Sequence, residues 1–102
     1  MPEFLYLIHP FRDGFFAAST PEENAVMEEH YAYLKDGMAA GRVLLAGPCL
    51  DDTFGLVILH AADEAAARAF MFNDPSVAGN VMAAELHPLR ISLAGKHLSP
   101  SQ

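Results

Sequence analysis

The sequence predicts an α+β domain of ferredoxin-like βαββαβ topology, with two helices on one face of an antiparallel sheet. Three observations support this: short apolar runs typical of strands, two longer stretches with helical spacing, and their order along the chain. That order is strand, helix, strand, strand, helix, strand, which is the split βαβ pattern. The 102 residues suit one domain, which we place at residues 1–95, and we expect residues 96–102 to form a flexible C-terminal tail.

The first helix is predicted from its start signal and its spacing. Thr20-Pro21-Glu22-Glu23 has the arrangement of a capping box, with a proline at a position where its missing N–H costs nothing. Gly41 is expected to end the helix. His30 is expected at the border of the apolar stripe of this helix. The stripe consists of Met27, Tyr31, Leu34 and Met38.

Four apolar runs predict the strands, and a second capping residue marks the second helix. Asp63 is the expected N-cap of that helix. Asn73-Asp74-Pro75 is expected to stop it, because a proline disfavours helical structure in the residue before it. Pro88 is expected to interrupt the last strand. The predicted strands cover residues 4–9, 43–46, 55–60 and 81–87.

The strands are apolar on both of their faces. Successive strand residues point to opposite sides of a sheet. The alternating sets are Phe4, Tyr6 and Ile8 against Leu5 and Leu7, and Leu56 and Ile58 against Val57 and Leu59. Two helices cover only one face, and a second copy of the chain is the simplest cover for the other. We therefore expect a homodimer, or a higher oligomer with an even number of chains.

Composition excludes several classes of function. A net charge of −7 argues against nucleic acid and anionic membrane surfaces as partners. No apolar run approaches the roughly 20 residues of a membrane span, nothing resembles a signal peptide, and Cys49 has no second cysteine, so we expect a cytoplasmic protein. The histidines lack zinc-type spacing and no glycine-rich phosphate-binding turn occurs, so we expect no metal site and no cofactor.

Several stretches, in their order and spacing, resemble the YCII-related (YciI-like) family of small proteins, which have the dimeric α+β barrel fold. The stretches are His30-Tyr31-Ala32-Tyr33-Leu34, Gly41 to Pro48, Gly55, Asn73 to Gly79, and the region near Pro88. The resemblance spans nearly the whole chain. Two positions depart from it. The family often has an arginine shortly before the histidine, where Met27-Glu28-Glu29 stands, and often an aromatic residue after Asp-Pro, where Ser76 stands.

The resemblance implies a histidine–aspartate centre, and the matching positions are His30 and Asp74. A carboxylate bonded to one ring nitrogen fixes the tautomer of a histidine and makes it a better base. Such a pair can abstract a proton without a cofactor. Since one member is similar to a dehydrochlorinase of a chlorinated hydroxyquinol, the resemblance implies lyase or isomerase chemistry. The expected ligand is a small cyclic or aromatic organic molecule.

Tyr33, Tyr6 and Arg12 are the candidate substrate-binding residues. Arg12 belongs to the stretch Phe11 to Ser19, which we expect to be a mobile loop that could close over a cleft. The phenylalanines of that loop could instead be packed permanently.

Purely structural roles could also explain each of these candidate site residues. A histidine near an apolar helix face is often a packing residue, and an aspartate before a proline often builds a turn or caps a helix end. Tyrosines such as Tyr6 and Tyr33 most often pack. Two other functions also stay open. One is a non-catalytic ligand-binding or regulatory module, and the other is a cofactor-free monooxygenase whose substrate would itself activate oxygen.

Overall fold

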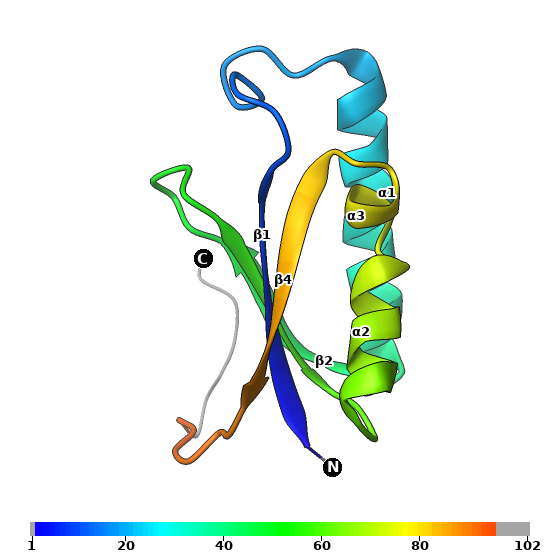
Figure 1. The fold of residues 1–102 in the computed structure, drawn as a ribbon, viewed down its shortest axis with the longest axis vertical. Helices are drawn as coiled ribbons and strands as arrows, with labels where there is room; N and C mark the ends of the chain where they lie inside the picture. Colours follow the sequence, from blue (N-terminus) through cyan, green and yellow to red (C-terminus); the bar gives the residue numbers. More distant parts are fainter. Residues whose placement is uncertain (1, 96–102) are drawn as a thin grey trace.

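Four strands form one antiparallel sheet in the order β2-β3-β1-β4, and the helices lie together on one of its faces (Figure 1). This computed structural model describes residues 2–95, so the tail predicted at 96–102 lies outside the described residues. The predicted α+β topology is confirmed, with one short helix added before the last strand. The elements are β1 (Glu3–Pro10), α1 (Pro21–Ala39), β2 (Val43–Pro48), β3 (Gly55–His60), α2 (Glu64–Phe72), α3 (Pro75–Ala78) and β4 (Met82–Leu89).

The face of the sheet beneath the helices forms the core. Tyr6 lies opposite Val57 in the register of β1 and β3, so both side chains point to this face. Phe4 and Leu59 form the next such pair, and all four residues are buried. Phe70 and other apolar residues of α2 pack against them from above. The hydrophobic effect of this burial holds the helices on the sheet.

The opposite face of the sheet is also apolar, and none of the helices formed by residues 2–95 covers it (Figure 1). Leu5 lies opposite Ile58, and Leu7 lies opposite Leu56. Leu45 of β2 extends the row beside Ile58. These five side chains are only partly buried. The sequence correctly predicted strands that are apolar on both faces and helices that cover one of them.

The start of α1 is fixed by the predicted capping box. The Thr20 hydroxyl accepts a hydrogen bond from the Glu23 N–H at 3.1 Å, and the Glu23 carboxylate accepts one from the Thr20 N–H at 2.8 Å. Two of the free amides at the helix N-terminus are thereby satisfied. Within residues 2–95 no helix is both long enough and apolar enough to cross a membrane.

The predicted apolar stripe of α1 is partly wrong, because the helix presents a different face to the sheet. Leu34 is buried, but Tyr31 and Met38 are 66% and 50% exposed. The face that packs inward consists of Val26, Met27, His30, Tyr33, Leu34 and Gly37. His30 therefore belongs to the inward face and does not lie at its border.

Gly37 accounts for this orientation of the helix. A Cβ atom at position 37 would lie 2.9 Å from Val43 Cγ2 and 3.0 Å from Phe70 Cζ, which is closer than side chains tolerate. Only a glycine lets α1 approach β2 and α2 so closely. His30 lies about two turns earlier on the same face, so the close approach at Gly37 also turns His30 inward.

The end of β4 also differs from the prediction. Pro88 does not interrupt the strand, which runs on to Leu89. The reason is that β4 is an edge strand with β1 as its only neighbour, and an edge strand tolerates a residue without an N–H. At the other edge, β2 likewise continues past its predicted end at residue 46 to Pro48.

We expect Gly37→Ala to destabilise the protein by about 1–3 kcal/mol, because the added methyl overpacks the contact with Val43 and Phe70. Urea denaturation measures the free energy of unfolding. Gly95→Ala is the control, since a Cβ atom there would meet nothing within 4 Å. Equal stability of Gly37→Ala and the unmodified protein would show that α1 can move away from the sheet at no cost.

Candidate active site

His30 and Asp74 meet between the helices and the sheet, although 44 residues separate them in the chain. His30 projects from the inward face of α1, and Asp74 lies one residue beyond Asn73, the C-cap of α2, and caps α3. The Nδ1 atom of His30 lies 2.7 Å from Asp74 Oδ1 and 2.9 Å from Oδ2. The side chain of His30 is 13% exposed and that of Asp74 is 0% exposed. The two residues that the resemblance paired are therefore in direct contact.

The short helix α3 determines where the Asp74 carboxylate points. Asp74 has an extended backbone and is the N-cap of α3, and Pro75 occupies the first helical position. Asp74 Oδ1 accepts hydrogen bonds from the Ser76 N–H at 2.9 Å and from the Ser76 hydroxyl at 2.8 Å. The sequence predicted that α2 ends at this point. The structure shows that α3 also begins here, and the hydrogen bonds at the start of α3 hold the Asp74 side chain in place.

Ser76 is a site residue that sequence reasoning noted only as a departure from the family pattern. It is fully buried, and its Oγ lies 3.2 Å from His30 Nδ1 as well as bonding Asp74. A fully enclosed position of this size suits a small polar side chain. The aspartate–proline–serine sequence itself could have indicated the role, because it has the order expected of an N-cap followed by a first helical turn.

Tyr6 supports Asp74 from the sheet. Its hydroxyl donates to Asp74 Oδ2 at 2.8 Å, and its side chain has no exposed surface. Burial, followed by the neighbouring Asp74 charge, raises the pKa of Tyr6 well above its ordinary value. The phenol therefore stays protonated and donates at neutral pH. The geometry supports a role for Tyr6 in holding Asp74, and contact of Tyr6 with a substrate stays a prediction.

Asp74 is ionised at neutral pH despite its burial. Burial alone would raise the pKa of Asp74, but the hydrogen bond and charge of His30 and the donors of Ser76 outweigh it and hold the pKa below its ordinary value. An ionised carboxylate only accepts hydrogen bonds, so the proton of the neutral imidazole lies on Nδ1. The lone pair is then on Nε2. Within residues 2–95, Nε2 has no hydrogen-bond partner and is not sealed from solvent.

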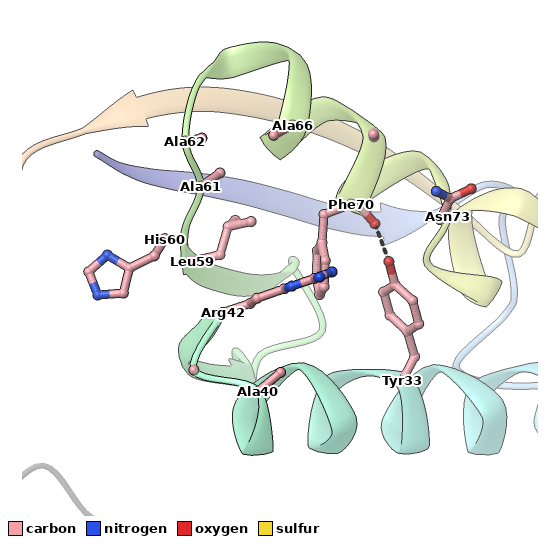
Figure 2. A pocket seen from close by; sticks show the side chains of 12 residues that line it. Tyr33, Ala40, Arg42, Leu59, His60, Ala61, Ala62, Ala66, Phe70 and Asn73 are labelled. Atoms are coloured by element: carbon pink, nitrogen blue, oxygen red, sulfur yellow. Dashed lines mark hydrogen bonds between the residues drawn. The ribbon is translucent and has the colours of Figure 1, made fainter. Parts of the chain in front are cut away.

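Tyr33 lies one turn beyond His30 on the same helix. Its hydroxyl donates to the Phe70 carbonyl at 2.8 Å, and its ring packs against the Phe70 ring with centroids 4.7 Å apart (Figure 2). Burial, then the Asp74 charge, raises the pKa of Tyr33, while Arg42 acts in the opposite direction. The raised pKa keeps the Tyr33 hydroxyl protonated, so it can donate to the α2 backbone. Contact of the Tyr33 ring with a substrate stays a prediction.

Arg12 fastens the loop between β1 and α1, and its contact with a ligand stays a prediction. Its guanidinium donates to both carboxylate oxygens of Glu23, at 2.8 and 2.6 Å, and to the Ala18 carbonyl at 2.9 Å. The hydrogen bond from Arg12 is the main cause that lowers the pKa of Glu23 to about 2. Phe15 is buried beneath the loop, while Phe16 is 52% exposed. The geometry supports a structural role for Arg12, and the mobility of the loop stays a prediction.

Metal binding was not expected from the sequence, and it stays untested. Among residues 2–95, no group of three or more histidine, cysteine, aspartate and glutamate side chains is arranged to hold a metal ion. His9 lies at the end of β1, while His60 and Glu3 face each other at the opposite end of β1 and β3, with His60 Nδ1 and Glu3 Oε2 3.5 Å apart.

A protein-family model matches most of the length of the chain. The family model described as the YCII-related domain matches residues 4–89. The chain belongs to the YCII-related family. That match includes Tyr6, His30, Asp74 and Ser76, so the entire hydrogen-bonded group lies within the family domain. No curated protein matches the sequence significantly.

A solved structure also resembles this member of the YCII-related family. It is a 5-chloro-2-hydroxyhydroquinone dehydrochlorinase (TftG) from Burkholderia phenoliruptrix in complex with 2,5-dihydroxybenzoquinone. The TM-score is 0.64, the sequences are 20% identical, and the match covers 85% of this chain and 93% of that chain. At this identity the likeness shows a shared fold and nothing beyond it.

Acid pH should reveal the contribution of Asp74 to stability. Because its pKa is lower in the folded than in the unfolded chain, its stabilisation is present above about pH 4 and is lost as the pH falls through the depressed folded value. We expect Asp74→Asn to cost about 1–3 kcal/mol at pH 7 and progressively less below pH 4. Urea denaturation across this range measures the difference.

Asp13→Asn is the control for that experiment, because Asp13 is exposed in the loop before α1. The difference in the free energy of unfolding between Asp13→Asn and the unmodified protein should not depend on pH in this way. A stability difference for Asp74→Asn that stays constant from pH 7 to pH 3 would contradict a depressed Asp74 pKa.

Proposed function

We propose that this protein is a cofactor-independent enzyme in which His30 takes a proton from a small cyclic or aromatic substrate during an elimination or isomerisation. The observation that carries the proposal is the contact of His30 Nδ1 with an ionised, fully buried Asp74, which leaves Nε2 as the basic atom facing solvent. Histidine is the side chain best suited to proton transfer near neutral pH. The TftG fold likeness is consistent with this class of chemistry.

The proton transfer would proceed with Asp74 as the orienting residue. Nε2 accepts the substrate proton, and the resulting imidazolium donates through Nδ1 to the Asp74 carboxylate, which stabilises its charge. Tyr6 and Ser76 hold the carboxylate in place through their own hydrogen bonds, so it needs no rearrangement during the reaction. In a dehydrochlorination, chloride leaves with the electrons of the carbon–chlorine bond. The electrons released by deprotonation then form a new double bond.

The substrate class that we propose is a chlorinated ring carrying several hydroxyl groups. TftG acts on 5-chloro-2-hydroxyhydroquinone, which belongs to this class. In the keto form of such a ring the carbon that carries chlorine is tetrahedral, so a base can remove the neighbouring proton while chloride leaves, and the same base can move the proton in the keto–enol isomerisation. A cofactor-free monooxygenase acting on a similar ring is the alternative enzyme, and oxygen consumption distinguishes it. A ligand-binding module would bind the ring and leave it unchanged.

Chloride release from a panel of chlorinated hydroquinones and hydroxyquinols tests the proposal. We expect turnover without oxygen uptake, and we expect His30→Asn to reduce the rate by about 10²–10⁴-fold. Asp74→Asn should cause a large loss as well, and the double variant should be little worse than the worse single one, because paired groups act as a unit. Chloride ion chromatography and an oxygen electrode give the two readouts.

Glu29→Gln is the matched control, because Glu29 lies on the exposed side of α1 beside His30. It should leave the rate unchanged. Turnover by His30→Asn at the unmodified rate would exclude His30 as the base. Tight binding of the rings with no chloride release and no oxygen uptake would favour the ligand-binding module.

We also propose that the chain forms a homodimer through the open face of the sheet. Leu5, Leu7, Leu45, Leu56 and Ile58 form a continuous, partly buried apolar surface across three strands. A surface of this kind on a small domain usually marks a contact with another chain. A second copy offers an identical apolar surface, so two sheets that pack face to face would satisfy both chains.

Light scattering at micromolar concentration should give twice the chain mass. Leu7→Glu places a charge in the middle of the open face, and we expect it to weaken the dimer at least about 100-fold. Phe72→Glu is the control, because Phe72 is 54% exposed on α2, on the helical side of the sheet. A soluble monomer of the unmodified protein at that concentration would rule out this proposal.

A further inference from the structure

A hollow separate from the His30 site lies between the C-terminal end of α1 and the start of α2. Its volume is about 490 Å³, which is within the range of small-molecule pockets. Neither His30 nor Asp74 lines it. Figure 2 shows Tyr33 and Ala40 along its α1 side, and Ala66 and Phe70 on the side of α2.

Small side chains leave this space open. Ala62, Ala66 and Ala69 line the hollow from the α2 side, where longer side chains would fill it. On the other side α1 ends at Ala39, and Gly41, with a φ of +80°, turns the chain toward β2. The result is an open hollow with a mostly apolar lining and one aromatic wall, formed by Phe70 and Tyr33.

Arg42 supplies the charge of this hollow. Among the described residues lining it, Arg42 is the only lysine, arginine, aspartate or glutamate, and it forms no ion pair within the described part of the chain. Its side chain extends into the hollow toward Phe70, whereas the His60 ring points away (Figure 2). Asp36 lines a smaller adjoining hollow together with Arg42 but makes no ion pair with it.

The two helix ends at the hollow do not cancel the charge of Arg42. The C-terminal end of α1 carries the negative end of its helix dipole, and the N-terminal end of α2 carries the positive end of its own. Because the two partial charges oppose one another, the guanidinium determines the sign of the site. An arginine binds a planar carboxylate with two parallel hydrogen bonds.

We propose that this hollow is a second ligand site that binds a small aromatic carboxylate. The carboxylate pairs with Arg42, and the ring packs among Phe70, Tyr33 and the alanines of α2. A phosphate group suits the site less well, because a single cation and apolar walls leave most of its oxygens without donors. The proposal does not rest on the activity proposed for His30.

Only the near end of the hollow adjoins the His30 site, through Tyr33, one turn from His30, and Asn73, next to Asp74. Ala40 lines the hollow, and His30 lies about 15 Å from Ala40 along the axis of α1, at the rise of an α-helix.

Titration of the ¹⁵N-labelled protein with benzoate, followed by amide chemical shifts, tests the proposal. We expect saturable shifts at Ala40, Ala62 and Ala69. Arg42→Gln should weaken binding by about tenfold or more, because the charge-assisted pair with the carboxylate is lost. Benzamide, which has the same shape without the charge, should bind more weakly by a similar factor.

Two further variants complete the test. Ala66→Leu fills the hollow from an exposed helix position and should abolish the benzoate shifts while the rest of the spectrum is preserved. Arg68→Gln is the matched control, because Arg68 lies outside the hollow and pairs with Glu64 on the surface of α2. Shifts confined to residues near His30, equal affinity of Arg42→Gln, or no saturable shift at the hollow would each overturn the proposal.

Discussion

The arrangement of this domain depends on one buried carboxylate. Asp74 has no exposed surface, and a carboxylate in that position is stable only if its oxygens are hydrogen-bonded. The donors come from three different elements: Tyr6 on β1, His30 on α1 and Ser76 on α3. Satisfying this single group therefore fixes the sheet, the long helix and the short helix relative to one another. Among residues 2–95 the same arrangement leaves Nε2 of His30 without a hydrogen-bond partner.

The long helix α1 connects the two regions to which we assign function. Its first half carries His30 toward Asp74, and its second half lines the hollow that contains Arg42. Gly37 lies between the two regions and lets the helix approach Val43 and Phe70 closely. The close packing at Gly37 thus lies on the same helix, between the residue that contacts Asp74 and the end that lines the hollow.

The predictions that failed all depended on which neighbours a residue meets in space. The α1 stripe was misplaced because the close approach at Gly37, and not average hydrophobicity, chooses the inward face. The bonds of Arg12 to Glu23 and of Tyr6 to Asp74 likewise depend on the fold, while the substrate contacts expected of both residues stay predictions. Pro88 remains within β4 because the strand lies at the edge of the sheet, and that position follows from topology.

The sequence by itself determined the local structure, since local signals act over a few residues. Thr20 to Glu23 encodes the helix start, and strand alternation encodes the two apolar faces. The family resemblance named His30 and Asp74, but periodicity could not bring them together. Only the tertiary structure decided that Tyr6 and Ser76 join them, because Tyr6 is 68 residues from Asp74 in the chain and their contact exists only once α1, α3 and β1 are packed. Burial and hydrogen bonding across such separations are properties of the folded chain, and they decide which side chains form the site.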